Sequence, residues 1–249
     1  MHEIISSISN AKIKEVRSLK DKKTRIAKQQ FIVEGVNIVK DIPNHVKFDL
    51  YYVLERREFV KDIISRASNS YEVTTKVMEA MSETVNPSGV LAVADMNKKP
   101  FSASNVVLYL DKINDPGNMG TIIRTAVALG VEEIIASDSV DAYSGKVVRS
   151  SMGGIFNTNV INVSEDEALR LIDGYKVYTL DMNGDNIFDR SFSIDNSRFV
   201  LAVGSEAHGI GEKLRLRADR VLSLPMTGKI ESLNAGVSMS TALYRIMFL

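Results

Sequence analysis

The sequence predicts an α/β protein with two domains: a small layered α/β domain, followed by a larger open parallel sheet with helices on both of its faces. Strand-like and helical segments alternate along the chain, which is typical of layered α/β folds. In the second part the strand-like runs are continuously apolar, as in strands buried on both faces of a parallel sheet. The segment MNKKPFSAS (96–104) is polar, contains a proline and has no periodicity. We therefore expect domains at residues 1–96 and 105–249, joined by a linker at 97–104.

The N-terminal domain is predicted from short alternating segments. The apolar residues of its first segment fall near helical spacing, with charged residues between them: Ile8, Ile13, Val16 and Leu19. β-rich runs and amphipathic stretches then follow in alternation. Strands are expected at residues 29–35, 48–54, 71–74 and 89–96, and helices at 36–40, 56–67 and 76–83.

The second domain is predicted from six apolar runs and the helical segments between them. Strands are expected at residues 105–111, 132–137, 158–163, 176–182, 199–204 and 220–225, and helices at 119–130, 143–151, 165–173, 210–217 and 234–247. Ligands of open parallel sheets bind beyond the carboxyl ends of the strands. The loops at those ends are therefore where a functional site is expected.

Composition excludes several classes of protein and site. Of the 249 residues, 45% are hydrophobic and 25% charged, as in ordinary globular proteins and unlike disordered ones. The absence of cysteine excludes disulfides, thiolate metal sites and a cysteine nucleophile. The three histidines, His2, His45 and His208, are scattered, so we expect no metal site. No apolar run has the roughly eighteen residues of a membrane span, and the N-terminus lacks a secretion signal. We therefore expect a cytoplasmic protein with no membrane partner.

Basic residues are concentrated near the N-terminus, although the net charge of the chain is zero. Residues 11–30 contain eight Lys and Arg residues against two acidic ones, Glu15 and Asp21, a balance of +6. We call the basic residues of this segment the basic stripe: Lys12, Lys14, Arg17, Lys20, Lys22, Lys23, Arg25 and Lys28. Such a stripe attracts a polyanion such as RNA at long range. The alternative is an ordinary solvated helix face.

The first of three polar loops, DKINDPGNMG (111–120), joins a predicted strand to a predicted helix. Pro116 and Gly117 are turn formers, and the backbone N–H groups at a helix start bind anions. Arg124 follows six residues after Asn118 and can clamp a phosphate through two hydrogen bonds. The loop matches neither GxGxxG nor GxxxxGK[ST], which argues against a dinucleotide-binding fold and a P-loop. The alternative is an ordinary strand-to-helix turn, with Arg124 in a surface ion pair.

The second loop, GSEAHGIG (204–211), follows the fifth predicted strand of this domain. Gly204 lets another group approach the backbone closely where the strand ends. Glu206 can accept a hydrogen bond from a hydroxyl or an amine; alternatively, its charge only favours a helix N-terminus. His208 is a candidate general base, or an exposed loop residue without a role.

The third loop, LPMTGKIESLNAG (224–236), joins the last predicted strand to the last predicted helix. Pro225 and Gly228 end the strand, and Ser232 or Asn234 is a sound helix N-cap. The helix that follows is rich in small residues, which allow another backbone to approach closely.

Together the three loops read NxGxxxRT, then GSExxG, then LPMxGxxxSLN before a small-residue helix. This order resembles the SpoU/TrmH branch of the SPOUT RNA methyltransferases, over roughly residues 105–249. The segment FIVEGVNIVKD (31–41) resembles the substrate-binding domain fused to many of these enzymes, which is related to small ribosomal RNA-binding proteins. The resemblance implies methylation of a ribose 2′-hydroxyl by S-adenosylmethionine, without a metal and with ribosomal RNA as substrate. It also implies a deep C-terminal trefoil knot and a homodimer through the C-terminal domain, in which each site is completed across the interface.

The resemblance also assigns residues to roles. The polar centre would comprise Asn118, Arg124, Glu206, Ser232 and Asn234. Backbone groups of Gly204, Leu224 and Leu233 would hold the methyl donor, with Pro225, Met226 and Ile230 nearby. Arg124 is the proposed base of the family, but a guanidinium stays protonated, so we assign it to clamping a phosphate and offsetting charge on the reacting oxygen. Two alternatives stay open: a tRNA 2′-O-methyltransferase, and a non-catalytic RNA-binding or ribosome-assembly protein on the same fold.

Overall fold

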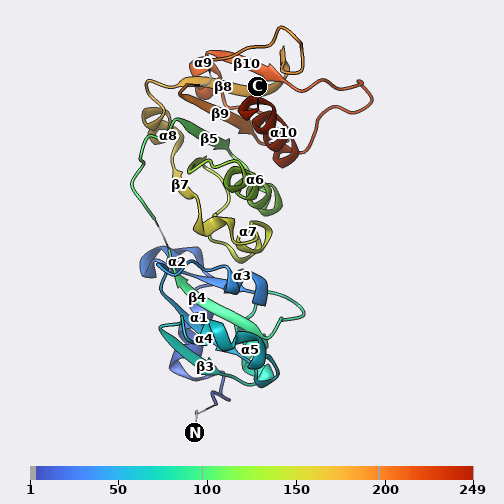
Figure 1. Ribbon diagram of the computed structural model, residues 1–249. Coiled ribbons are helices and arrows are strands. Elements are labelled where there is room, and N and C mark those ends of the chain that lie inside the picture. The colour runs from blue at the N-terminus through green and yellow to red at the C-terminus, as the bar shows by residue number, and fades with distance from the viewer. Residues whose placement is uncertain (1–3, 97, 196, 249) are drawn as a thin grey trace. The chain divides into compact units, whose positions relative to one another are not determined.

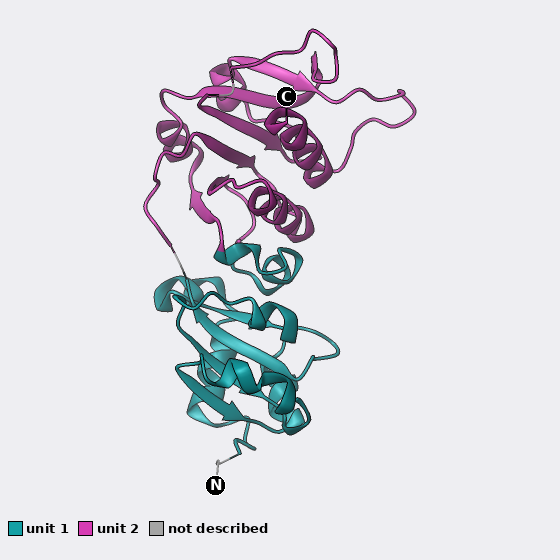
Figure 2. Cartoon of the chain, in the orientation of Figure 1, with its two compact units in different colours: residues 1–97, 143–156 teal, residues 98–142, 157–249 magenta. Residues whose placement is uncertain are grey.

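The structure is a computed structural model in which residues 4–96, 98–195 and 197–248 are described (Figure 1). His2 and the first linker residue, Asn97, lie outside the described residues. The chain divides into two compact units (Figure 2). Unit 1 contains residues 1–97 and 143–156, and unit 2 contains residues 98–142 and 157–249. Residues 143–156, which the sequence predicts to lie in the second domain, therefore pack with the first.

Unit 1 is built on a four-stranded sheet in the order β1-β4-β2-β3. Its strands are β1 (Gln30–Glu34), β2 (Phe48–Tyr52), β3 (Asn69–Glu72) and β4 (Val90–Asp95), and the helices of its first segment are α1 (Ala11–Ser18), α2 (Lys22–Lys28), α3 (Val36–Lys40), α4 (Lys61–Ile64) and α5 (Thr75–Met81). β4 is antiparallel to β1 and β2, whereas β2 and β3 run parallel. Ile13 and Val16 of α1 join Val77 and Met81 of α5 in one buried cluster, so the amphipathic first helix covers the sheet as predicted.

Two expectations for unit 1 were wrong. The helix expected at 56–67 is divided into two 3-10 turns, Leu54–Arg56 and Glu58–Val60, and the single turn α4. No side chain caps the start of any of these three pieces, so the segment lacks a signal that would fix one continuous helix, although Val60 and Ile63 are buried at helical spacing. Ile8 is 40% exposed, because α1 begins only after its N-cap, Asn10, whose side chain accepts from the Lys12 N–H.

We call residues 143–156 the returning segment; it carries α7 (Gly145–Ser150) and a 3-10 turn at Gly154–Phe156. The ring of Phe31 in β1 packs edge-on against Tyr143, with centroids 5.0 Å apart, and lies 5.7 Å from the ring of Phe156. Arg149 forms an ion pair of 3.7 Å with Glu34, which is only 4% exposed. The returning segment thus supplies both apolar and charged partners to β1 of unit 1.

Unit 2 is built on a six-stranded sheet in the order β10-β8-β9-β5-β6-β7, and all five strand pairs are parallel. Its strands are β5 (Val106–Asp111), β6 (Glu133–Ser137), β7 (Asn159–Val163), β8 (Lys176–Asn186), β9 (Phe199–Gly204) and β10 (Arg220–Ser223), and its helices are α6 (Pro116–Ala128), α8 (Glu165–Leu171), α9 (Glu212–Arg217) and α10 (Ala235–Met247). The predicted open parallel sheet is therefore confirmed.

Helices cover both faces of this sheet. Ala168 of α8 and Leu214 of α9 pack in one buried cluster with Tyr109 and other residues of β5, β6, β8 and β9. α6 and α10 lie side by side against the opposite face (Figure 1). No helix among the described residues is long and apolar enough to cross a membrane.

β8 pairs with β10 in two separate stretches. Thr179 pairs with Val221, but the next residue of β10, Leu222, pairs with Asp185, so residues 180–184 of β8 leave the regular register. Gly184 lies directly against the β10 backbone, because a Cβ atom there would come within 2.5 Å of the Leu222 carbonyl carbon. The strand expected at 176–182 therefore extends to Asn186 and contains a bulge at the edge where a ligand is expected.

Candidate active site

The first polar loop places Asn118 at the carboxyl edge of the sheet. Asp115 caps α6 by accepting a 2.8 Å hydrogen bond from the Asn118 N–H, and Pro116 occupies the first turn, where its missing N–H costs nothing. α6 therefore begins three residues earlier than the expected helix. The side chain of Asn118 is 7% exposed and points toward the second and third loops, as its hydrogen bonds show.

Glu206 joins the three loops. Its Oε1 accepts hydrogen bonds from Asn118 Nδ2 at 3.1 Å, from Asn234 Nδ2 at 3.0 Å and from the Ala235 backbone N–H at 3.2 Å. Asn234 Nδ2 also donates to Asn118 Oδ1 at 2.7 Å. Because one carboxylate oxygen receives three donors, Glu206 holds the starts of α6 and α10 together. We call Asn118, Glu206 and Asn234 the polar cluster.

Small residues let α6 and α10 approach each other behind the polar cluster. A Cβ atom on Gly236 would lie 3.3 Å from the Thr121 Cβ and 3.4 Å from the Asn118 Cα, closer than most side chains tolerate. Further along, the hydroxyls of Thr125 and Ser240 are 2.8 Å apart. The small residues singled out in the sequence thus set the spacing of these two helices.

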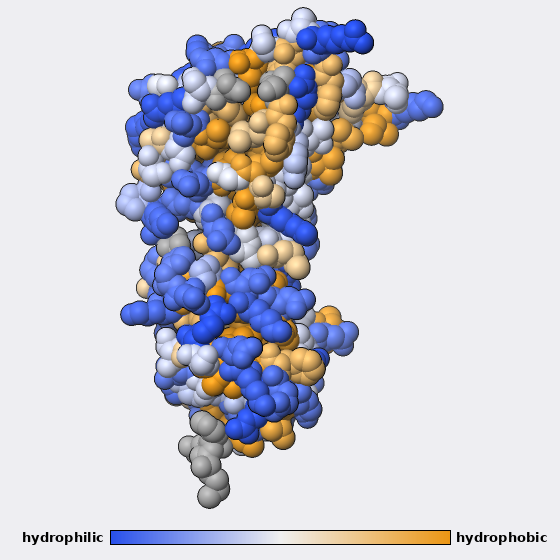
Figure 3. Space-filling model, in the orientation of Figure 1, coloured by the Kyte–Doolittle hydropathy of each residue, from blue (hydrophilic) through white to orange (hydrophobic). Residues whose placement is uncertain are grey.

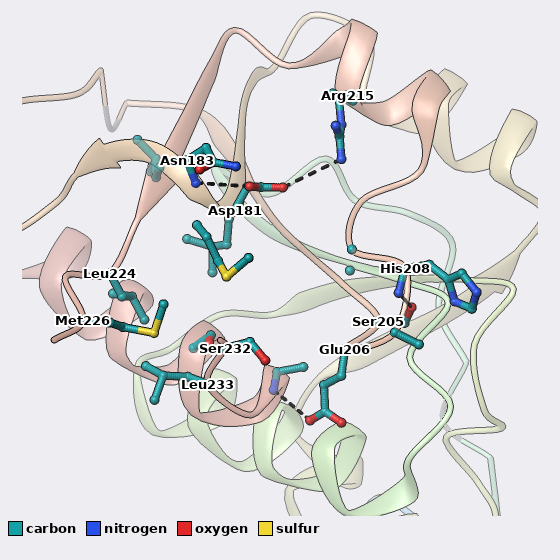
Figure 4. A pocket seen from close by; sticks show the side chains of 18 residues that line it. Asp181, Asn183, Ser205, Glu206, His208, Arg215, Leu224, Met226, Ser232 and Leu233 are labelled. Carbon is teal, nitrogen blue, oxygen red and sulfur yellow. Dashed lines mark hydrogen bonds and ion pairs between the residues drawn. The ribbon is translucent and has the colours of Figure 1, made fainter. Parts of the chain in front are cut away.

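A cavity of about 430 Å³ opens beside the polar cluster (Figure 4). A volume of this size is within the range of sites for small organic ligands. Its walls combine apolar side chains with a few polar ones: Leu180, Asp181, Met182, Asn183, Gly204, Ser205, Glu206, Ala207, His208, Gly209, Arg215, Leu222, Leu224, Met226, Ser232, Leu233, Ala235 and Ser238.

The structure brings most of the predicted site residues to this cavity. Those that line it are Gly204, Glu206, Leu224, Met226, Ser232 and Leu233. Asn118 and Asn234 are not among the lining residues, but each donates a hydrogen bond to Glu206, which lines the cavity. Pro225 and Ile230 belong to the same loop but are not among the lining residues, and the side chain of Ile230 is 56% exposed.

Arg124 lies apart from the cavity of its own chain. Six residues of helix place it about 240° around α6 from Asn118. Its side chain is exposed and has neither a hydrogen-bond nor an ion-pair partner in the described part of the chain. Among the described residues the structure thus shows no surface ion pair for Arg124, and its exposed guanidinium is accessible to a ligand or a second molecule.

Sequence reasoning missed one wall of the cavity. Residues 180–183 and Arg215 line it, but residues 180–182 fall in the strand expected at 176–182, Asn183 lies just beyond it, and Arg215 falls in the helix expected at 210–217, so none of them was expected at a site. The dipeptide Asn183-Gly184 is a turn signal directly after the strand expected at 176–182, and it marks the bulge that opens β8 toward the cavity.

Asp111 fixes both ends of the loop at 204–211. It is fully buried at the end of β5, where it pairs with Gly204 of β9, and its Oδ2 accepts a 2.6 Å hydrogen bond from the Gly211 N–H. Nearby, burial raises the pKa of Tyr109 to about 12, and the Asp111 and Glu165 carboxylates act in the same direction. The wall formed by residues 204–209 is thus anchored by a side chain outside the cavity.

Replacing Asp111 with alanine is expected to lower the free energy of unfolding by about 1–3 kcal/mol, because the Gly211 N–H loses its acceptor. Asp111→Asn keeps an acceptor oxygen and should lose clearly less, measured by urea denaturation. Glu132→Ala, at an exposed position, serves as the control with a change within about 0.5 kcal/mol. Equal losses for the alanine and asparagine variants would contradict the anchoring role.

The basic stripe lies on α1 and α2, with Lys20 in the turn between them, and not all of its side chains are free to contact a ligand. Arg25 is 5% exposed and donates to the carbonyls of Leu19 and Lys20, so it is part of the core and not of the surface stripe. Lys20 donates to the carbonyls of Ala80 and Ser82, and Lys28 pairs with Glu15.

Lys12 donates to the Tyr71 hydroxyl, a contact that raises the pKa of this lysine. Four exposed members of the stripe have no direct side-chain hydrogen bond or ion pair within the described ranges: Lys14, Arg17, Lys22 and Lys23. These four are the ones free to contact a polyanion.

Among the described residues no group of three or more His, Cys, Asp or Glu side chains is arranged to hold a metal ion.

Comparison with known proteins identifies the family. The model of the SpoU rRNA Methylase family matches residues 105–244, and that of the MRM3-like substrate binding domain matches residues 10–92. The chain is 28% identical to the 23S rRNA (guanosine(2553)-2′-O)-methyltransferase RlmP of Bacillus subtilis, over 97% of this chain and 98% of that protein. It is also 28% identical to the 23S rRNA (uridine(2479)-2′-O)-methyltransferase of Streptomyces viridochromogenes, over 94% of this chain and 88% of that protein.

The solved structures agree with the sequence relatives. An AdoMet-bound rRNA methyltransferase from Sinorhizobium meliloti matches with a TM-score of 0.83 and 26% identity, over 98% of this chain and 96% of that chain. The resemblance read from the three loops is thereby confirmed. Since the SpoU model alone spans more than half of the sequence, the chain belongs to the SpoU rRNA methylase family.

Proposed function

We propose that this protein transfers the methyl group of S-adenosylmethionine to a ribose 2′-hydroxyl of ribosomal RNA. The observation that carries the proposal is the polar cluster, which hydrogen bonds hold beside a cavity of about 430 Å³ at the carboxyl edge of the sheet. Relatives whose names state this reaction match almost the whole chain.

The cavity fits the methyl donor in size and chemistry. Leu180, Leu222 and Leu224 form an apolar wall suited to an adenine ring, and Gly204 allows a close approach to the backbone. Main-chain groups of Gly204, Leu224 and Leu233 would hold the nucleoside, with Met226 on the wall and with Pro225 and Ile230 shaping the loop. When bound, S-adenosylmethionine supplies an electrophilic methyl group.

The residues of the chain then have to position the ribose oxygen in line with the methyl–sulfur bond. Asn118 and Asn234 orient the loops and the hydroxyl, and Glu206 fixes both amides through one oxygen. Ser232, which lines the cavity and is exposed, holds the target nucleotide. Arg124 keeps its proton, clamps the neighbouring phosphate and offsets negative charge on the reacting oxygen.

The proposal includes a homodimer through unit 2. Figure 3 shows hydrophobic side chains gathered on the face of unit 2 that carries α10. Its large exposed members are Phe188, Val237, Tyr244, Met247 and Phe248, which are between 37% and 74% exposed, and a hollow of about 490 Å³ lies among them. A contiguous apolar patch of this kind is typical of a protein interface. Because α6 lies beside α10, a dimer formed here gives Arg124 access to the site of the other subunit.

Tyr244→Asp combined with Phe248→Asp is expected to convert the dimer into a monomer, because two charges would be buried in the interface. Sedimentation equilibrium should give twice the chain mass of 27.6 kDa for the unaltered protein and the single mass for the variant. Leu216→Asp, at a position 82% exposed on α9, should remain dimeric. A wild-type protein that sediments as a monomer would contradict the dimer.

The proposal also includes the C-terminal trefoil knot of the family. Two features support it. Residues 180–184 leave the register between two stretches of pairing with β10, and Gly184 lies so close to the Val221 and Leu222 backbone that a Cβ atom would meet it at 2.5–2.7 Å. Such close contact between two backbones is compatible with one segment of chain passing under another.

Unit 1 is assigned to RNA binding, in agreement with its substrate-binding family model. Replacing Lys14, Arg17, Lys22 and Lys23 with glutamate is expected to weaken RNA binding at least tenfold and to flatten its dependence on salt, because fewer counterions are released. Binding is measured by fluorescence anisotropy across a salt series, and the affinity for the methyl donor should be unchanged. Reversing two exposed lysines outside the stripe, Lys61 and Lys76, is the control. Unaltered RNA affinity in the variant with four glutamates would show that the basic stripe is an ordinary solvated surface.

Two measurements test the proposal as a whole. Calorimetric titration with S-adenosylmethionine separates an enzyme from a non-catalytic RNA-binding protein, which would not bind the donor. Mapping 2′-O-methyl groups in ribosomal RNA and tRNA from cells with and without the protein should reveal one ribosomal position that loses its methyl group. A lost position in tRNA would favour the alternative tRNA enzyme. We propose a cytoplasmic location, because a ribosomal RNA substrate is available there.

A further inference from the structure

One ion pair in the wall of the cavity has no role in the polar cluster. Asp181, in the bulge of β8, and Arg215, on α9, approach to 3.7 Å between Oδ2 and Nη2. Figure 4 shows them facing each other at one side of the cavity, with Glu206 and Ser232 at the other. Their side chains are 27% and 59% exposed, so both charges are accessible from the cavity.

Both partners retain hydrogen-bonding capacity. Asp181 Oδ1 accepts from the Asn183 N–H at 3.2 Å, which orients the carboxylate but leaves further lone-pair positions on both oxygens. Arg215 uses Nη2 for Asp181 and for the carbonyl of Ile210 at 3.5 Å, and no described residue bonds its Nε or Nη1. The ion pair is therefore held in place, and both side chains can still form further hydrogen bonds.

The charges in the cavity limit what this pair can bind. Of the described residues that line the cavity, Arg215 has the only permanent positive charge, and Asp181 and Glu206 have the carboxylates. Glu206 already accepts three donors through Oε1. A ligand with one ammonium and one carboxylate would therefore find its matching charges at Asp181 and Arg215.

We infer that Asp181 and Arg215 bind the amino-acid end of S-adenosylmethionine, the ammonium group at Asp181 and the carboxylate at Arg215. The inference rests on the proposed function and identifies two binding residues that the loop motifs do not contain. The three substituents of a sulfonium point in different directions. If the methyl group faces the polar cluster, the amino-acid chain is directed away from Glu206 and Ser232, toward the side where the ion pair lies (Figure 4).

The test compares two ligands that differ only at this end. S-adenosylhomocysteine has the ammonium and the carboxylate, whereas 5′-methylthioadenosine has the same nucleoside and a neutral thioether without them. Arg215→Ala and Asp181→Asn in the full chain should each weaken S-adenosylhomocysteine about tenfold by calorimetry, the loss of one charge-assisted hydrogen bond. Both variants should bind 5′-methylthioadenosine within twofold of the unaltered protein, which also shows that the cavity is intact.

A third ligand assigns the two charges separately. The 3-aminopropyl thioether of adenosine retains the ammonium and lacks the carboxylate, so its binding should fall in Asp181→Asn and stay unchanged in Arg215→Ala. Lys213→Ala is the matched control: it removes an ion pair of the same helix, 2.5 Å from Asp166, that does not line the cavity. This control should bind all three ligands normally.

Two results would overturn the inference. Equal weakening of S-adenosylhomocysteine and 5′-methylthioadenosine would show that the pair contacts the nucleoside or only holds the wall. Unchanged binding of S-adenosylhomocysteine in both variants would show that the pair takes no part. If the unaltered protein binds neither ligand, the proposed function itself fails, so the two failures are distinguishable.

Discussion

Arg124→Ala is expected to lower methyl transfer about a thousandfold, the size of effect seen when a group that stabilises developing charge is removed. The exposed guanidinium has no partner in the described part of the chain, so its removal leaves the fold without a lost contact. Because Arg124 is not among the residues that line the cavity, affinity for S-adenosylmethionine should stay within twofold. Single-turnover transfer to RNA and calorimetry give the two quantities. Near-normal turnover of the Arg124→Ala variant would show that Arg124 has no role in the mechanism.

If the proposed homodimer forms, an experiment that mixes two variants decides which subunit Arg124 serves. The two variants to be mixed are complementary. Arg124→Ala has an intact cavity but lacks the arginine, and a second variant has the arginine but a blocked cavity. If Arg124 acts on the partner's site, a mixed dimer of the two contains one complete site and recovers activity. If it acts within its own chain, neither half of the mixed dimer is complete, and the mixture stays inactive.

Gly204→Ala is the variant with the blocked cavity. It is also the second substitution for which we expect a large loss, here of affinity for S-adenosylmethionine. A Cβ atom on Gly204 would collide with the carbonyl of Gly209 and would come within 2.5 Å of the Ile210 nitrogen. These are backbone atoms of the loop that lines the cavity. Because Asp111 holds both ends of that loop, the loop can accommodate the added Cβ atom only by changing its shape, which alters the cavity. Affinity for S-adenosylmethionine is expected to fall at least a hundredfold, and overpacking should cost about 1–3 kcal/mol of stability.

Gly174→Ala separates the loss of the cavity from general destabilisation. Gly174 has a φ of +76° and open space around its missing side chain, so alanine there costs about 1 kcal/mol through backbone strain alone. Its affinity for S-adenosylmethionine should be normal. If Gly204→Ala binds as well as Gly174→Ala, the close approach at Gly204 is not needed by the donor.

Most of the fold could be predicted because the parallel sheet has an unambiguous pattern. Strands buried on both faces are continuous apolar runs, and a helix with a strong cap such as Asn234 begins at a recognisable residue, whereas the Asp115 cap starts α6 three residues before the expected helix. The helix expected at 56–67 is broken although Val60 and Ile63 are buried at helical spacing, because apolar spacing alone does not show where a segment without capping side chains is interrupted. The placement of residues 143–156 depends on tertiary contacts with Phe31 and Glu34, which no local pattern contains.

The polar cluster could be predicted because parallel strands bring their carboxyl ends to one edge, whatever their separation in sequence. This placed Asn118 near Glu206 and Asn234, and the structure adds the hydrogen bonds. The wall at Asp181 could not be predicted, since Asn183-Gly184 signals a turn, whereas the bulge itself depends on how β8 pairs with β10. Arg25 shows the same limit: its charge suggests surface, but two carbonyls bind it in the core.

The returning segment restricts how this enzyme can be recombined with its relatives. A chimera that grafts residues 1–96 onto another methyltransferase would inherit β1 without Tyr143, Phe156 and Arg149. Phe31 would then meet foreign side chains, and the carboxylate of Glu34 would lack its cation. The substrate-binding part is consequently not an interchangeable module: a working graft has to transplant two separate pieces of chain together.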